Sequence, residues 1–267
     1  MLSEAYLILA IRSLEVLFAW SLGLQTLEYL RMGQATSERG LWAWSIQRRD
    51  VPEPWIRRGL DVLFLPPVHA VHLLLRMLAV CVLAVWGASL PLVLFLFVGN
   101  VLILIRWRGA FNGGSDFMTL VVLTGLLIAQ VGMCWLDPMQ AWKAGLWYIT
   151  IQSVTSYFMS GWVKTLRPEW RSGAAMTVFL NAAIHGPLSP NHVLRKPWVA
   201  CLGSWAFMVW EACFPLALLH PLLAIGFCSV AAVFHFLVFW FFGLNRFFWA
   251  WLASFPAIVW CSSQLVG

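Results

Sequence analysis

Long apolar runs separated by shorter polar stretches extend along the whole chain. Eight of these runs approach the roughly 20 apolar residues that a helix needs to cross the hydrocarbon core of a bilayer. They lie at about 5–30, 69–89, 91–106, 116–136, 145–164, 198–219, 221–242 and 246–263. The pattern predicts an all-α fold, a polytopic bundle of about eight transmembrane helices that forms one membrane domain, 1–267.

Two of the connections between these runs are long. Residues 32–68 mix tryptophans with charged side chains, which is typical of an amphipathic helix that lies on the inner leaflet. Residues 165–197 contain the apolar run 174–184, which is too short to cross a bilayer. We therefore expect a re-entrant or interfacial helix near 173–186.

Basic residues are unevenly distributed among the connections. The first, third, fifth and seventh connections hold nearly all the Lys and Arg residues between the runs, whereas the even-numbered ones hold only Lys143. Basic residues favour the cytoplasmic side, so the odd connections, including both long ones, are expected there and both termini outside. Anionic lipid beside this basic face accounts for the net charge of +6 without a nucleic-acid partner.

The composition supports a membrane protein and gives no sign of a metal or disulfide framework. Hydrophobic residues make up 61% of the chain and charged residues 10%, against about 25% charged in a typical soluble domain. The six cysteines form no Cys-x-x-Cys pair, and most lie inside apolar runs, so we interpret them as buried side chains. No metal is expected.

Lys164 ends the apolar run 145–164. A lysine at the edge of a bilayer is unfavourable unless another group pairs with it or uses it. One interpretation is a catalytic base. The other is a cytoplasmic anchor whose ammonium group reaches the lipid headgroups, and position alone favours this second interpretation.

The sequence Asn112-Gly113-Gly114-Ser115-Asp116 stands at the entry to the fourth run. Two adjacent glycines let the backbone turn tightly or approach a ligand closely. Asp116 at the start of a helix is also a suitable capping residue and partner for the helix dipole. Both interpretations, a ligand site and a helix cap, remain open from the sequence.

Two further polar residues lie in the middle of apolar runs. Glu211 is a functional candidate by default, because a carboxylate inside a membrane span is rare; the alternatives are pairing with an interior arginine or protonation. Pro215, one turn later, is expected to loosen the helix. For His235, a hydrogen-bonded core histidine is favoured over a role in proton transfer.

Two smaller groups are interpreted as structural. Arg12 and Glu15 lie three residues apart and share a helix face, which predicts an internal ion pair. His69, His72 and Arg76 also share one face, and because no acidic or cysteine partner completes a metal site, a cluster at the cytoplasmic edge is favoured.

The segment around Lys164 resembles a known family. Tyr157 and Phe158, then Gly161, then Lys164, and finally Trp170 with Gly173 follow the pattern Tyr-Phe-x-x-Gly, lysine, Trp-x-x-Gly. This pattern resembles the HTTM group, the membrane domain of vitamin K-dependent gamma-carboxylases and their bacterial relatives. The resemblance extends to Asn112–Asp116, to Glu211 with Phe214-Pro215, and to His235.

In the carboxylases, a lysine of that segment deprotonates vitamin K hydroquinone. Oxygenation then generates a strong base that removes a proton from a peptide glutamate, and carbon dioxide adds. The resemblance implies that Lys164 has the role of catalytic base. Val163 stands where the carboxylases carry a second lysine, and Gly114 where they carry a histidine. Small bacterial members, which include proteins needed to mature a secreted antimicrobial toxin, are nearer to this chain in size.

The resemblance thus implies a membrane-embedded enzyme of the bacterial inner membrane that uses a reduced quinone and acts on a small peptide or protein. The residues expected to line its pocket with Lys164 are Asn112, Gly113, Gly114, Asp116, Tyr157, Trp170, Glu211 and His235. A non-catalytic membrane partner for the maturation, export or immunity of a small secreted peptide is the alternative. The sequence is compatible with both functions and with any oligomeric state.

Overall fold

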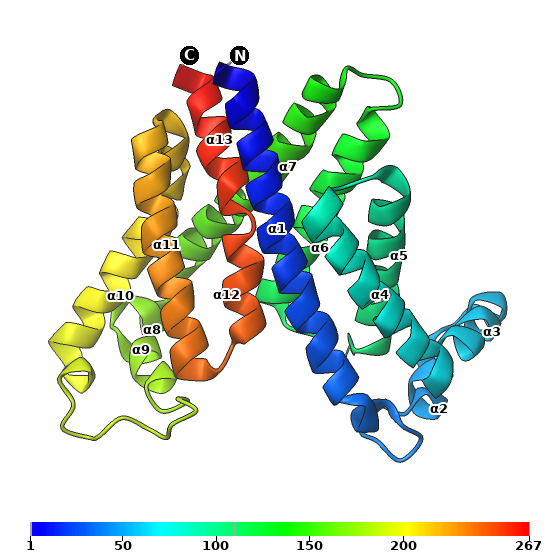
Figure 1. Ribbon diagram of the computed structural model, residues 1–267. Helices are drawn as coiled ribbons and strands as arrows, with labels where there is room; N and C mark the ends of the chain where they lie inside the picture. Colours follow the sequence, from blue (N-terminus) through cyan, green and yellow to red (C-terminus); the bar gives the residue numbers. More distant parts are fainter. Residues whose placement is uncertain (1, 109–110, 267) are drawn as a thin grey trace. The chain divides into compact units, whose positions relative to one another are not determined.

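Every regular element that the structure describes is a helix. The computed structural model describes residues 2–108 and 111–266, and thirteen α-helices lie within these ranges (Figure 1). The all-α prediction is therefore confirmed for the described residues. The α-helices are α1 Leu2–Arg31, α2 Trp44–Gln47, α3 Pro54–Leu63, α4 Pro66–Trp86, α5 Leu90–Arg106, α6 Gly113–Gly132, α7 Pro138–Thr165, α8 Pro168–Arg171, α9 Ala174–Phe179, α10 Pro197–Ala212, α11 Pro221–Phe242, α12 Asn245–Leu252 and α13 Phe255–Val266. Short 3-10 helices lie at η1 Gly33–Thr36, η2 Arg48–Asp50, η4 Val193–Arg195 and η5 Phe214–Leu219.

Four helices among the described residues are long and apolar enough to cross a membrane: α1, α4, α6 and α11. Helix α5 is equally apolar but has only 17 residues. This set favours a membrane protein. The remaining predicted runs are also helical. Helix α7 carries many polar residues, and the runs predicted at 198–219 and 246–263 are each interrupted.

Prolines explain the two interruptions. Helix α10 ends at Ala212, and Pro215 stands in the first turn of the 3-10 helix η5 that follows. This agrees with the loosening of the helix that the sequence predicted near Pro215. The run at 246–263 is divided into α12 and α13, and Pro256 is the second residue of α13. Proline lacks a backbone N–H and disfavours helical geometry at the preceding residue, so it begins helices more readily than it continues them.

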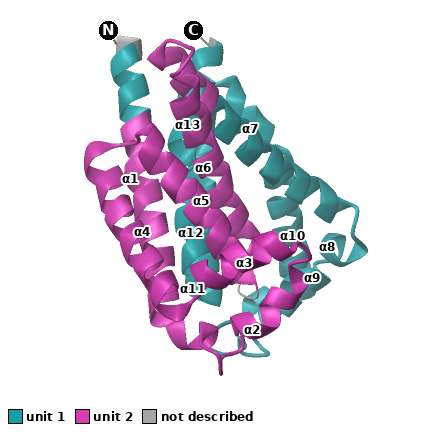
Figure 2. Cartoon of the chain, turned by 90° about the vertical axis from the view of Figure 1, so that its right-hand side faces the viewer, with its two compact units in different colours: residues 1–10, 146–267 teal, residues 11–145 magenta. Residues whose placement is uncertain are grey.

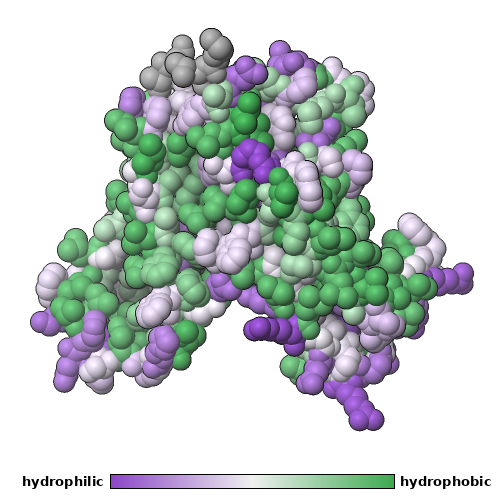
Figure 3. Space-filling view, in the orientation of Figure 1, coloured by the Kyte–Doolittle hydropathy of each residue, from purple (hydrophilic) through white to green (hydrophobic). Residues whose placement is uncertain are grey.

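The chain divides into two compact units, shown in different colours in Figure 2. Unit 1 comprises Met1–Ala10 and Leu146–Gly267, and unit 2 comprises Ile11–Gly145. Apolar side chains are extensively exposed in both: on α4 of unit 2 they include Leu74 and Leu78, and on α11 of unit 1 Val230 and Val233. Hydrophobic residues cover much of the surface in Figure 3. Exposed apolar surface on this scale marks contact with lipid or with other proteins.

In unit 2, the connection 32–68 is built of four short helical elements, and the longest of them, α3, has the amphipathic character that the sequence predicted. The guanidinium group of Arg106 holds this connection at the end of α5. It donates hydrogen bonds to the carbonyl oxygens of Trp42 at 2.6 Å and Thr36 at 2.5 Å, and to Gln47 Oε1 at 3.1 Å. A buried arginine thus replaces the missing helical hydrogen bonds of this segment.

In unit 1, the predicted helix near 173–186 is much shorter than expected. Helix α9 covers only Ala174–Phe179, and the chain beyond it is irregular. Its backbone bonds to neighbouring segments instead: Ile184 N donates to Phe241 O at 2.9 Å, and Leu188 N donates to Leu180 O at 3.2 Å. Gly186 and Pro187 follow directly and favour a turn over further helix.

Candidate functional site

The side chain of Lys164 lies in a compact polar centre in unit 1, between α7 and α10. Its Nζ donates to Glu211 Oε2 at 2.6 Å and Oε1 at 2.8 Å, and to Ser160 Oγ at 2.9 Å. Ser160 in turn donates to Glu211 Oε1 at 3.0 Å. The side chains of Lys164 and Glu211 are 19% and 5% exposed, so the lysine is not a headgroup anchor extended into water. We call Ser160, Lys164 and Glu211 the Lys164 centre.

Two aromatic rings stand beside the ammonium group of Lys164. Its Nζ lies 4.4 Å from the ring centroid of Phe207 and 5.0 Å from that of Trp170, within the range of cation–π attraction. Phe207 precedes Glu211 by one turn on the same face of α10, so one helix supplies both the carboxylate and a ring. Trp170 comes from the short helix α8.

Two glycines of the motif explain how these groups meet. A Cβ added to Gly161 would lie 2.5 Å from Ala212 N and 2.8 Å from Glu211 Cβ, so α7 lies directly against the end of α10 only because residue 161 has no side chain. Gly173 has φ +80, and a Cβ there would lie 2.5 Å from Cys201 N. It lets the chain turn back onto α10.

A second polar pair lies on the same face of α7. Tyr157 OH and His235 Nε2 are 2.6 Å apart, and both residues are buried. Tyr157 stacks on Phe214 with 4.0 Å between ring centroids, and His235 stacks on Trp251 at 5.1 Å. Tyr157 and Lys164 are seven residues apart, two helical turns, so this pair and the Lys164 centre share one side of the helix. His235 Nδ1 has no hydrogen-bond partner among the described residues.

The Asn112–Asp116 segment forms a helix cap in unit 2. Asn112 is the N-cap of α6, and its Oδ1 accepts hydrogen bonds from Gly114 N at 3.1 Å and Ser115 N at 3.2 Å. Asp116 Oδ2 accepts from Asn112 N at 2.7 Å. A Cβ at Gly113 would make only ordinary contacts. The contacts therefore support the capping interpretation.

Asp116 also belongs to a buried polar network that the sequence analysis missed. Gln25 Nε2 donates to Asp116 Oδ1 at 3.0 Å, and Gln25 Oε1 accepts from Arg76 Nη2 at 2.7 Å. Arg76 Nη2 also donates to Asn100 Oδ1 at 3.1 Å. All four side chains are buried, and they come from α1, α4, α5 and α6. Their common signal in the sequence is a polar residue inside a separate apolar run.

The residues predicted to line one pocket are therefore distributed over both units. Unit 1 contains Tyr157, Lys164, Trp170, Glu211 and His235, and unit 2 contains Asn112, Gly113, Gly114 and Asp116. The structure brings Lys164, Glu211 and Trp170 together and joins Tyr157 to His235. Ser160 and Phe207 were missed, although each lies one helical turn from a predicted residue.

The Arg12–Glu15 ion pair predicted from the sequence is confirmed. Arg12 Nη2 also donates to Ala84 O at 2.8 Å, and Glu15 Oε1 accepts from Ala88 N at 2.7 Å, so the pair fixes α1 to the end of α4. His69 accepts a hydrogen bond from Trp107 Nε1 at 3.1 Å. Among the described residues, no three His, Cys, Asp or Glu side chains come together as a metal-binding group.

No model of a known protein family, no curated protein and no solved structure matches this chain.

Proposed function

We propose that this chain is a vitamin K-dependent carboxylase-like (HTTM) protein of the bacterial inner membrane, with about eight crossings and both termini outside. Its proposed activity is quinone-dependent modification or maturation of a small peptide. The supporting observation is the Lys164 centre. Four of the residues that carry the family resemblance, Gly161, Lys164, Trp170 and Glu211, contribute to it directly, stand beside it or let α7 approach α10.

The geometry of the Lys164 centre suits a base that works inside a membrane. At 2.6 Å, the proton between Lys164 Nζ and Glu211 Oε2 can move to the carboxylate. The result is a neutral amine beside a carboxylic acid, and the net charge of the pair does not change. Moving charge within an apolar medium is unfavourable, so this internal transfer is an accessible route to a free amine.

The side chains of this centre fit a reduced quinone. When bound, such a cofactor supplies an acidic hydroxyl group and reducing electrons. Neutral Lys164 accepts a proton at Nζ, and Glu211 holds the proton that the lysine released. The rings of Phe207 and Trp170 provide flat apolar surfaces beside the amine. Ser160 orients the carboxylate through its hydrogen bond to Oε1.

The second candidate function is a non-catalytic membrane partner in the maturation, export or immunity of a small secreted peptide. The contacts of the Lys164 centre favour it when they are interpreted as a structural link between two helices, here called a clamp. The three hydrogen bonds of Nζ engage both carboxylate oxygens and Ser160, which fastens α7 to α10. A lysine with this role needs its charge but not its basicity.

Substitution of Lys164 separates the two functions. Lys164→Arg keeps the positive charge, but a guanidinium group does not release its proton at physiological pH. A catalytic base is lost in this variant, whereas a clamp survives in part. Lys164→Met removes both the positive charge and the basic amine. Lys143→Met, at the other end of the same helix, is the matched control.

Each variant is expressed in cells that also produce the small peptide whose maturation is proposed above, and membrane insertion of the variant is confirmed. Quinone and peptide products are then compared by mass spectrometry. The catalytic proposal predicts that both Lys164 variants lose the product and that Lys143→Met retains it. Product formation by Lys164→Arg at the level of the unsubstituted protein would contradict a role for Lys164 as base and favour the clamp.

A further inference from the structure

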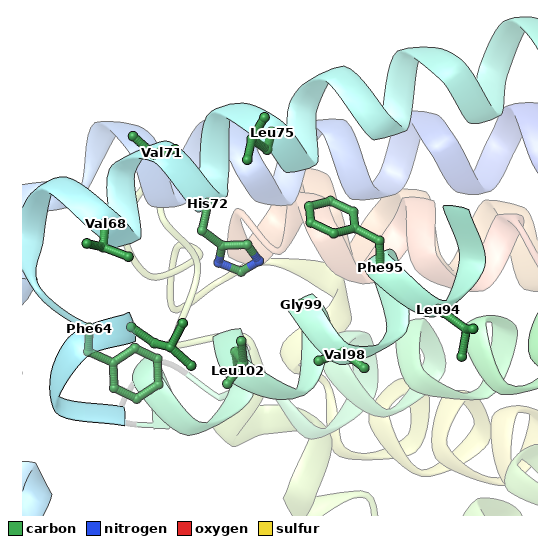
Figure 4. A pocket seen from close by; sticks show the side chains of 11 residues that line it. Phe64, Val68, Val71, His72, Leu75, Leu94, Phe95, Val98, Gly99 and Leu102 are labelled. Carbon is green, nitrogen blue, oxygen red and sulfur yellow. The ribbon is translucent and has the colours of Figure 1, made fainter. Parts of the chain in front are cut away.

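A groove with a volume of about 500 Å³ runs between α4 and α5 in unit 2 (Figure 4). This volume lies within the range of small-molecule binding sites. Its lining includes His72 and the apolar residues Leu63, Phe64, Val71, Leu75 and Val98. None of them belongs to the Lys164 centre or to the helix cap at Asn112.

A glycine faces a histidine at the floor of the groove. A Cβ added to Gly99 would lie 2.7 Å from His72 Nε2, so the imidazole occupies space that any other residue at 99 would fill. The ring of Phe95 meets that of His72 edge-on, with 6.2 Å between centroids. His72 Nε2 is buried without a hydrogen-bond partner among the described residues. The floor therefore holds one buried polar atom beneath an apolar channel.

The walls of the groove fit a hydrocarbon chain. Val71, Leu75 and Val98 are each 50% to 55% exposed, although all three are apolar. Water in contact with such walls is unfavourable by about 25 cal/mol for each Å² of apolar surface. Helix α4 is itself long and apolar enough to cross a membrane, and the membrane location proposed above would place lipid beside these walls. Apart from His72, every lining side chain is apolar, so the walls give a polar ligand no hydrogen-bond partner.

One end of the groove is formed by Leu63 and Phe64, at the end of the amphipathic helix α3. Two of the three carboxylates near α3 are paired, Asp61 with Arg48 at 2.6 Å and Asp50 with Arg108, and the third is Glu53, the N-cap residue of the helix. Arg58 of α3 is exposed and has no hydrogen bond or ion pair among the described residues.

Its neighbour Arg57 donates to a carbonyl oxygen, that of Val51, at 2.6 Å, and has no carboxylate partner within the described ranges. Arg57 and Arg58 thus give the helix at this end of the groove more positive charge than Glu53 alone can balance. An interfacial position suits such a helix, because anionic headgroups lie at the same depth.

We propose that the groove between α4 and α5 binds one hydrocarbon chain of an anionic phospholipid, whose phosphate lies beside the arginines of α3. The lipid is a resident partner of unit 2. The site rests on the membrane location proposed above but not on the chemistry of Lys164, so loss of that chemistry leaves the lipid site standing, and loss of the lipid site leaves that chemistry standing.

Native mass spectrometry of the full chain, purified in detergent and titrated with phosphatidylglycerol or phosphatidylcholine, tests this site. Val71→Trp fills the groove, and Val85→Trp makes the same change at a similarly exposed position of α4 outside it. Val98→Phe fills the groove from α5, should Val71→Trp not fold. We expect a loss of roughly tenfold in phosphatidylglycerol affinity for the groove variants only.

Arg58→Gln tests the headgroup. Near a lipid surface one arginine changes affinity roughly fivefold, so this variant should reduce the preference for phosphatidylglycerol over phosphatidylcholine by about that factor. Equal retention of lipid by the Val71→Trp and Val85→Trp variants would overturn the site. Equal binding of both lipids by the unsubstituted protein would overturn the proposed preference for an anionic headgroup.

Discussion

The two units each bury a polar centre, but the two centres are built from different groups. In unit 1, Lys164 and Glu211 bond directly, and aromatic rings stand beside the lysine. In unit 2, the amide side chains of Gln25 and Asn100 join Asp116 and Arg76 in a network that draws on four helices.

This difference separates a centre suited to chemistry from one suited to support. Amide groups do not titrate, so a network that contains them holds fixed donors and acceptors in place. An acid in direct contact with an amine can exchange a proton with it. Buried charges in a membrane are functional candidates by default, and the comparison of these two centres suggests the kind of partner as a criterion for choosing between the two roles.

The largest expected effect is loss of the network in unit 2. Arg76→Met removes the donor that Gln25 Oε1 and Asn100 Oδ1 share, and leaves buried acceptors unpaired. We expect the free energy of unfolding in detergent to fall by about 3 kcal/mol. A loss below about 1 kcal/mol, the usual value of a membrane hydrogen bond, would mean that the network is not a structural support.

The next effect is smaller and concerns the contact between α7 and α10. Gly161→Ala places a Cβ 2.5 Å from a backbone nitrogen, so the helices must separate. We expect a loss of about 2 kcal/mol in unfolding free energy and impaired function of the Lys164 centre. Gly226→Ala is the control, since a Cβ there meets nothing within 4 Å. Equal stability of the two variants would contradict the close approach.

Removal of a single hydroxyl should have a modest effect. Tyr157→Phe deletes the bond to His235 and keeps the stacked ring. We expect a loss of about 1 kcal/mol in unfolding free energy, measured in the same detergent. Tyr148→Phe on the same helix is the control. A stability of Tyr157→Phe equal to that of the control would show that the pair contributes nothing to the fold.

The smallest effect is a titration in α3. A hydrogen bond from Arg48, with another from Trp44, lowers the pKa of Asp61 from about 3.8 to about 2. Because the pKa is lower in the folded state, the stabilisation from this pair is complete above pH 4 and is lost as the pH falls through 2. Carbon NMR of the Asp61 carboxyl group should show a midpoint near 2, and Arg48→Gln should return it towards 3.8. An unchanged midpoint in that variant would exclude Arg48 as the cause.

Local patterns in the sequence predicted the helices well and the cap at Asn112 in part. Apolar runs, prolines and the i, i+3 spacing of Arg12 and Glu15 act over a few residues, so their consequences can be derived without tertiary structure. The predicted helix near 173–186 was too long, because α9 ends at Phe179 and the backbone beyond it bonds to neighbouring segments instead. The number of crossings stays a prediction.

By itself, the sequence determined an all-helical, strongly apolar chain and singled out Lys164, Glu211, Asp116 and His235 as polar residues in unfavourable surroundings. Only the tertiary structure decided their partners. Lys164 and Glu211 are 47 positions apart, and Gln25 and Asp116 are 91 apart. Contacts over such separations depend on how helices pack, and that packing rests on details such as the missing side chain of Gly161, which no local pattern reveals.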